Sequence, residues 1–86
     1  MSTFPIELRP LARTVIVSDD ELTVGLADRR VITVPLVWFP RLVHASAAAR
    51  SNSEILGDGE GIHWPDADED LSVEGLLLGN RTRGVA

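Results

Sequence analysis

The chain has 86 residues, 44% of them hydrophobic, which suffices for one small domain with a thin core. It contains no cysteine, which excludes disulfides, thiol catalysis and cysteine-bound zinc. All eight basic residues are arginine, and the absence of lysine excludes Schiff-base chemistry. The formal net charge is −5, and neither a bilayer-spanning apolar run nor a secretory leader is visible, so a cytoplasmic protein that does not enter a membrane is expected.

The first part of the chain predicts three strands. Residues 14–17 are β-branched, residues 22–26 alternate apolar with small or polar side chains, and residues 31–34 are again β-branched. Because these segments are close in sequence, we expect them to form an antiparallel meander within about residues 13–34. Pro35 cannot donate a hydrogen bond to a ladder, so the third strand should end there.

The middle of the chain predicts one helix over about residues 38–50. Apolar and small side chains recur there at three- and four-residue spacing, and Pro40 suits the first helical turn. Trp38 stands at the junction between strand and helix. Its core role is favoured over that of an exposed stacking platform, because large aromatic side chains dominate burial in small domains.

The second part of the chain predicts a short hairpin and a short helix. The strand candidates 54–56 and 61–64 flank a glycine-rich loop, and an acidic loop is expected over residues 65–70. Ser72 is a candidate N-cap and Gly79 a candidate terminator, which predicts a helix over about residues 72–78.

Together these elements predict an α+β fold: a small antiparallel β-meander with a central helix, a second short hairpin and a short C-terminal helix. The domain is placed at residues 13–79, with an N-terminal arm or edge strand at 1–12 and a frayed tail at 80–86. The predicted core residues are Leu22, Val24, Leu26, Ile32, Val34, Leu42, Ile62, Leu76 and Leu77.

Three patterns that resemble chemical motifs do not hold. Asp66, Asp68 and Asp70 occupy the first, third and fifth places of a calcium loop, but the sixth and twelfth places hold leucine instead of glycine and glutamate. The glycine-rich loop at 57–61 lacks dinucleotide-binding spacing and carries acids that would repel a phosphate. His63 is interpreted as a structural histidine, and nothing in the spacing brings it to His44. No catalytic residue, metal site or cofactor is therefore predicted.

The acidic residues are concentrated in one half of the chain. Residues 1–43 contain five arginines and five acids, whereas eight acids and no arginine lie between Glu54 and Glu74. This half would repel nucleic acid and attract a basic partner. The predicted partner-binding residues, which combine carboxylates with aromatic side chains, are His63, Trp64, Asp66, Asp68 and Asp70. The alternative places Trp64 in the core and gives the acids a role in solubility only.

Two sequence blocks resemble a known family. They are Val34-Pro35-Leu36 with Phe39-Pro40-Arg41-Leu42, and Gly59-Glu60-Gly61-Ile62-His63-Trp64-Pro65 followed by Asp68-Glu69-Asp70-Leu71-Ser72-Val73. Over about residues 13–79 the chain resembles the short bacterial proteins of the domain of unknown function 2442 family. The resemblance implies a β-meander with helices packed on it and no established enzymatic activity. The usual Asp-Gly-Arg turn of that family reads Asp28-Arg29-Arg30 here, which puts the turn geometry in doubt.

The favoured function is a non-enzymatic interaction module, in its narrowest form the acidic, antitoxin-like member of a two-protein system with a basic small protein encoded nearby. The resemblance supports this form by analogy, because relatives are often encoded beside another short protein. A second hypothesis is a small ligand-binding or enzymatic domain that uses His63 and the carboxylates of Asp66 to Asp70. A third is a nucleic-acid-associated regulator that uses its arginines, although direct nucleic-acid binding is disfavoured. A homo-oligomer is left open.

Overall fold

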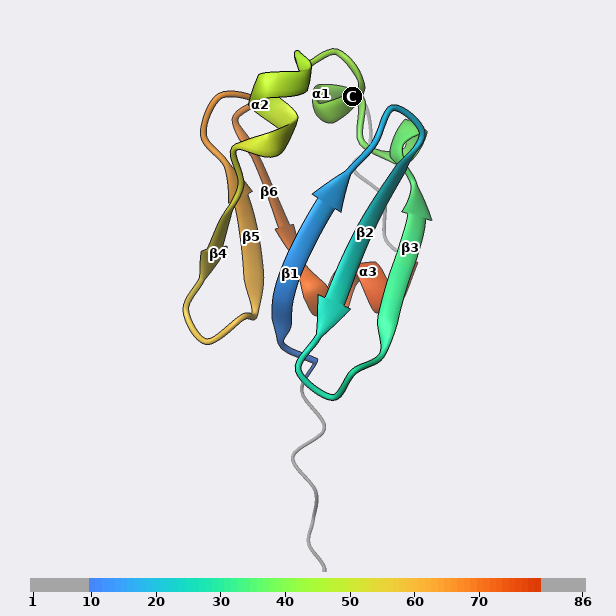
Figure 1. Cartoon of the computed structure of the whole chain (residues 1–86), viewed down its shortest axis with the longest axis vertical. Coiled ribbons are helices and arrows are strands. Elements are labelled where there is room, and N and C mark those ends of the chain that lie inside the picture. The colour runs from blue at the N-terminus through green and yellow to red at the C-terminus, as the bar shows by residue number, and fades with distance from the viewer. Residues whose placement is uncertain (1–9, 80–86) are drawn as a thin grey trace, which may run out of the picture.

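The computed structural model describes residues 10–79, which form two three-stranded antiparallel sheets joined and followed by short helices (Figure 1). Sheet A contains β1 (Ala12–Val17), β2 (Glu21–Leu26) and β3 (Val31–Pro35). The 3₁₀ helix η1 (Leu36–Trp38) and the helices α1 (Pro40–Val43) and α2 (Ala47–Ser51) lead to sheet B. Sheet B contains β4 (Glu54–Leu56), β5 (Gly61–Trp64) and β6 (Glu69–Ser72), and α3 (Val73–Leu77) follows directly. The expected α+β class is confirmed. The predictions for residues 1–9 and 80–86 lie outside the described residues.

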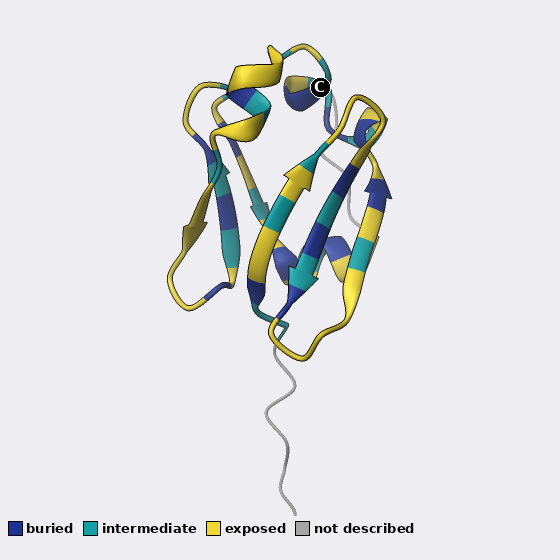
Figure 2. Ribbon diagram, in the orientation of Figure 1, coloured by how far each residue is buried: buried dark blue, intermediate teal, exposed yellow. Residues whose placement is uncertain are grey.

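Sheet A is the predicted meander, with strand order β1-β2-β3. Along β2 the side chains alternate as expected, because Leu22, Val24 and Leu26 are buried while the residues between them reach the opposite face (Figure 2). β1 begins at Ala12, earlier than predicted, with an irregularity in the pairing between Ala12 and Thr14. The meander therefore presents one face to the core, and no element within residues 10–79 covers the other.

The turn between β2 and β3 keeps its form although it lacks the family's glycine. Arg29 takes a positive φ of 78°, the conformation in which glycine is favoured. Asp28 closes the turn, because its Oδ1 accepts from the Arg30 backbone N–H at 3.0 Å and its Oδ2 accepts from Arg30 Nε at 2.7 Å. The hydrogen bonds of Asp28 thus stabilise a turn conformation that glycine would adopt without strain.

The single central helix predicted over residues 38–50 is wrong, because the segment breaks into η1, α1 and α2. Pro40 does stand at the start of α1, but α1 ends at Val43. Ser46 is extended and its hydroxyl accepts from Ala49 N at 3.0 Å, which makes it the N-cap of α2. A serine before an alanine run offers the backbone this alternative to a continuous helix.

Sheet B has three strands, whereas the sequence predicted a hairpin of two. The glycine-rich loop joins β4 to β5 as predicted, but one third of the acidic loop expected at 65–70 is strand, because Glu69 and Asp70 open β6. Gly59 holds the two sheets together: its carbonyl accepts from Ala12 N at 2.8 Å. Its φ is 115°, and a Cβ there would lie 2.8 Å from the Ala12 backbone, so only glycine fits.

The short C-terminal helix α3 is confirmed, with Ser72 as N-cap accepting from Gly75 N at 2.9 Å. Leu76 is buried, but Leu77, predicted as core, is 42% exposed because a helix this short turns only one stripe inward.

The core lies between the sheets and the helices. Its buried members are Ala12, Leu22, Val24, Leu26, Val34, Leu36, Phe39, Leu42, Ile62, Trp64, Val73 and Leu76. Ile32 and Trp38 are half-buried and pack against it, which agrees with their predicted core role only in part. Within residues 10–79 no helix is long and apolar enough to cross a bilayer.

Candidate functional site

The five residues predicted to form one partner-binding surface lie in three different places. Trp64 is fully buried, and its Nε1 donates to the Arg50 carbonyl at 3.0 Å. The strand period explains this, because in β5 Ile62 and Trp64 face inward while Gly61 and His63 face outward. The prediction that Trp64 lines a surface is therefore wrong, and the alternative that placed it in the core is correct.

Asp66 and Asp68 belong to the turn between β5 and β6, which faces the helices. Asp66 Oδ2 accepts from Asn52 Nδ2 at 3.0 Å. Arg41 of α1 donates to the Asp68 carbonyl and lies 3.8 Å from the Asp68 carboxylate. The acidic segment contains no arginine of its own, but the fold brings Arg41 to Asp68 from 27 positions away in sequence.

His63 and Asp70 meet on the outer face of sheet B. Their side chains are cross-strand neighbours, and His63 Nδ1 lies 2.6 Å from Asp70 Oδ1. Since a carboxylate only accepts, Nδ1 carries the proton in this pair. On the other side of His63 the pairing partner is Glu54 of β4, so two carboxylates flank one imidazole across three strands.

We call the outer side of sheet B the acidic face. Its residues, in two cross-strand rows, are Glu54, His63, Asp70, Leu56, Gly61 and Ser72. A groove of about 490 Å³ runs over it; its lining residues are Leu56, Gly57, Glu60, Gly61, Asp70, Leu71 and Ser72. Leu56 is 42% exposed at this groove, and no arginine occurs between residues 54 and 72. The face therefore combines negative charge with an apolar strip.

A second hollow, of about 520 Å³, lies between the helices and the β5–β6 turn. Its lining includes Arg41, His44, Ser46 and Asp66. His44 is thus on this hollow, whereas His63 is on the acidic face. Among residues 10–79 no three histidine, aspartate or glutamate side chains stand close enough to share a metal ion.

Within residues 10–79, the groups that the second hypothesis would use do not gather around His63. Ser72, the nearest hydroxyl in sequence, caps α3 by accepting from Gly75 N. Glu69 of β6 is buried on the inner side of sheet B, and its Oε1 accepts from Asp70 N at 3.1 Å. Of the acids expected to act with His63, only Asp70 reaches it.

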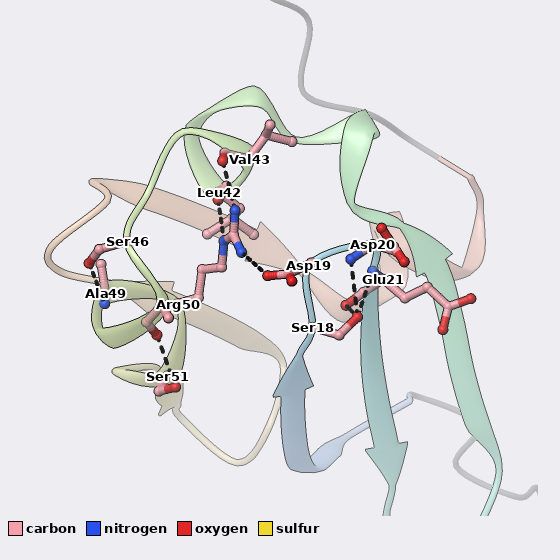
Figure 3. A network of polar contacts seen from close by, with 11 residues as sticks. Ser18, Asp19, Asp20, Glu21, Leu42, Val43, Ser46, Ala49, Arg50 and Ser51 are labelled. Atoms are coloured by element: carbon pink, nitrogen blue, oxygen red, sulfur yellow. Dashed lines mark hydrogen bonds and ion pairs between the residues drawn. The ribbon is translucent and has the colours of Figure 1, made fainter.

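The four arginines at positions 29, 30, 41 and 50 do not form one basic face. Arg29 and Arg30 lie at the β2–β3 turn, while Arg41 and Arg50 lie among the helices at the opposite end of the molecule (Figure 1). Arg50 is a structural residue: it donates to the carbonyls of Leu42 and Val43, both at 2.8 Å, and to Asp19 Oδ1 at 3.0 Å (Figure 3). It satisfies the end of α1 and ties it to the β1–β2 turn.

Sequence reasoning missed Glu54 and Leu56 as members of the site. The pairing of Glu54 with His63 and of Leu56 with Gly61 follows from the hairpin across residues 57–60. The glycine-rich turn was the available signal, because the hairpin register that it sets places Glu54 opposite His63 and Leu56 opposite Gly61.

Comparison with known proteins agrees with the fold and the two sequence blocks. The model of the family "Protein of unknown function (DUF2442)" matches residues 12–82. The chain belongs to the DUF2442 family. A crystal structure of a protein of unknown function from Rhodospirillum rubrum is similar to this DUF2442 chain, with a TM-score of 0.74 and 31% identity over 87% of this chain and 93% of that one.

A solution structure of an uncharacterised protein from Chromobacterium violaceum shares the DUF2442 fold as well. Its TM-score is 0.71 at 24% identity, covering 86% of this chain and 70% of that chain. No protein with a curated description is detectably similar to the chain. The family is thus established, and its function must be argued from the surface of the molecule.

Proposed function

We propose that this DUF2442 protein is a non-enzymatic binding module whose acidic face takes up a basic, partly apolar segment of a protein partner. The observation that carries the proposal is the groove on that face, whose lining combines the exposed Leu56 with the carboxylate of Asp70. The strands of sheet B contain no arginine. A buried apolar contact supplies affinity, and the surrounding charges select a basic partner.

The spacing of the charges suits arginine or lysine side chains of an extended segment. Glu54 and Asp70 stand on either side of His63, two strands apart, which is roughly 10 Å. His63 is held by Asp70, so the row is ordered before a partner arrives. An ordered site loses less conformational freedom on binding.

The edge of sheet B supports an extended partner. In the part of the chain that the structure describes, β4 pairs with β5 alone and all three of its residues are exposed, so its outer edge is open to a further strand. A strand added there would gain main-chain hydrogen bonds and bring alternate side chains over the acidic face.

Titration with a peptide in which arginine alternates with leucine tests the proposal directly. We expect amide resonances of β4, β5 and β6 to shift at low salt, with much weaker shifts for the same peptide carrying glutamate in place of arginine. The double variant Glu54→Arg, Asp70→Arg should weaken binding at least about tenfold. Equal binding of both peptides, or unchanged affinity in that variant, would overturn the proposal.

The matched control reverses two acids outside the groove. Asp66 and Asp68 already contact Asn52 and Arg41, so Asp66→Arg with Asp68→Arg adds the same charge but should leave the affinity for the basic peptide within about threefold. A loss equal to that of the first variant would mean that net charge alone attracts the peptide.

The narrower hypothesis, an antitoxin-like chain bound to a basic small protein encoded nearby, is one form of this proposal. Such a partner would occupy the acidic face. Co-expression of the neighbouring short protein with the wild-type chain and with Glu54→Arg, Asp70→Arg checks it, because the complex should purify intact only with the wild type.

A further inference from the structure

The outer side of sheet A differs from the acidic face because its two central rows lack charge. We call it the meander face; its residues, in two cross-strand rows, are Thr14, Gly25, Val31, Ile16, Thr23 and Thr33. Ile16 and Val31 are 65% and 63% exposed, and the hydroxyls of Thr23 and Thr33 lie 3.4 Å apart. The Thr14 side chain lies over Gly25 and occupies the space that a side chain at position 25 would need.

No described element covers the meander face. α3 lies behind sheet A, on its core side, and the strands stand clear in front of it (Figure 1). An antiparallel sheet with β-branched residues on an open face is suited to pack against a second sheet, about 10 Å away.

The two ends of sheet A carry opposite charges. At one end, Asp19 and Asp20 lie in the β1–β2 turn and Glu21 begins β2; of these three acids, Arg50 engages only Asp19. At the other end, Asp28 engages Arg30, which leaves Arg29 and the exposed Arg13. Among the described residues, Asp20 and Glu21 at one end and Arg13 and Arg29 at the other form no ion pair.

We propose that the meander face binds a second copy of this chain, sheet against sheet. A two-fold axis that lies between the sheets and crosses the strands places the acidic end of each copy over the basic end of the other. The interface is then self-complementary, with the uncharged rows in its centre and four opposite-charge contacts at its rim. The face is smaller than a standard interface, so dimers should form at chain concentrations on the order of 100 µM.

Sedimentation velocity at low ionic strength tests the dimer with two complementary variants. Asp20→Arg with Glu21→Arg makes both ends basic, and Arg13→Glu with Arg29→Glu makes both ends acidic. Each variant alone should dimerise about tenfold more weakly than the wild type, because like charges then meet. An equimolar mixture of the two should associate again, and added salt should weaken it.

The outcomes separate this interface from the acidic face. All four side chains lie outside the core, so each variant should keep the wild-type circular dichroism spectrum. Glu54→Arg with Asp70→Arg should leave dimerisation unchanged, and Ile16→Glu should abolish it. A wild-type chain that is monomeric at 1 mM, a mixture that does not associate, or a dimer lost only in the sheet B variant would each overturn the proposal.

Discussion

Sheet A and sheet B have the same topology but opposite outer faces. Each is a three-stranded antiparallel meander, and each buries its inner residues in one common core. The outer face of sheet A carries no charge in its two central rows, whereas that of sheet B sets His63 between Glu54 and Asp70. The inner faces are constrained by packing, so the outer faces are where the two sheets are free to differ.

This difference underlies the two binding roles proposed above. In those proposals the outer face of sheet A, uncharged in its central rows, binds a second copy of the chain, and the acidic face binds a basic partner. Arg50 and Gly59 connect the sheets, because Arg50 joins the helices to the β1–β2 turn and Gly59 joins the β4–β5 turn to β1. The contrast between the two outer faces requires that inward residues contribute strongly to the free energy of unfolding and that outward residues contribute little.

Trp64 gives the largest expected effect and tests that condition within one strand. Trp64→Ala removes a fully buried indole and its hydrogen bond to Arg50, so the free energy of unfolding should fall by about 3–5 kcal/mol. His63→Ala, the neighbouring outward residue, should lower it by less than about 1 kcal/mol. Urea denaturation measures both, and similar losses for the two would remove the distinction between inner and outer faces.

Arg50 tests whether the link between the helices and sheet A is structural. Its side chain is only 14% exposed. Arg50→Ala removes the guanidinium donor from the carbonyls of Leu42 and Val43, of which Leu42 keeps another donor, the Ala45 N–H. We expect a loss of about 2–3 kcal/mol in unfolding free energy. Arg50→Lys should recover only part of it, because an ammonium lacks the planar fork. The exposed Arg41 is the control: if Arg41→Ala were as damaging, the special role of Arg50 would be refuted.

The tight turns sharpen the comparison further. Arg29 in sheet A and Asp68 in sheet B both have positive φ, 78° and 52° respectively. Arg29→Gly should stabilise the chain by about 0.5–1 kcal/mol, measured by thermal unfolding of dilute protein. Arg29→Ala removes the same charge but keeps the strain and should bring no gain. Asp68→Gly should gain less than Arg29→Gly, because aspartate tolerates this conformation.

The smallest effect is a pH dependence in the same turn. The Arg30 backbone N–H, with further help from its guanidinium, holds the pKa of Asp28 below its ordinary value. Because the folded pKa is the lower one, this stabilisation is complete above the unfolded value near ~4 and is lost as the pH falls through the folded pKa. Asp28→Asn should therefore be less stable than the wild type at pH 7, and the difference should shrink at pH 2.5. A difference that persists in acid would point to a cause other than ionisation.

Much of the fold was predictable because its signals are local. β-branched runs and alternation marked β1 to β3, and Ser72 with Gly79 marked α3, since strand period and helix caps act over a few residues. The break of the central helix was also a local event, set by Ser46 before an alanine run, but helical periodicity outweighed it in the interpretation. β6 was missed because the short strand hides within acidic residues that are usually typical of a loop.

The sequence by itself determined the secondary-structure class, the family and the concentration of acids in the second half of the chain. Only the tertiary structure decided which of those acids act together. Trp64 points into the core, Asp68 contacts Arg41, and Asp66 accepts a hydrogen bond from Asn52. His63 lies between Glu54 and Asp70 on the neighbouring strands. Side-chain direction in a strand reverses at every residue, so neighbours in sequence separate to opposite faces while residues on different strands meet.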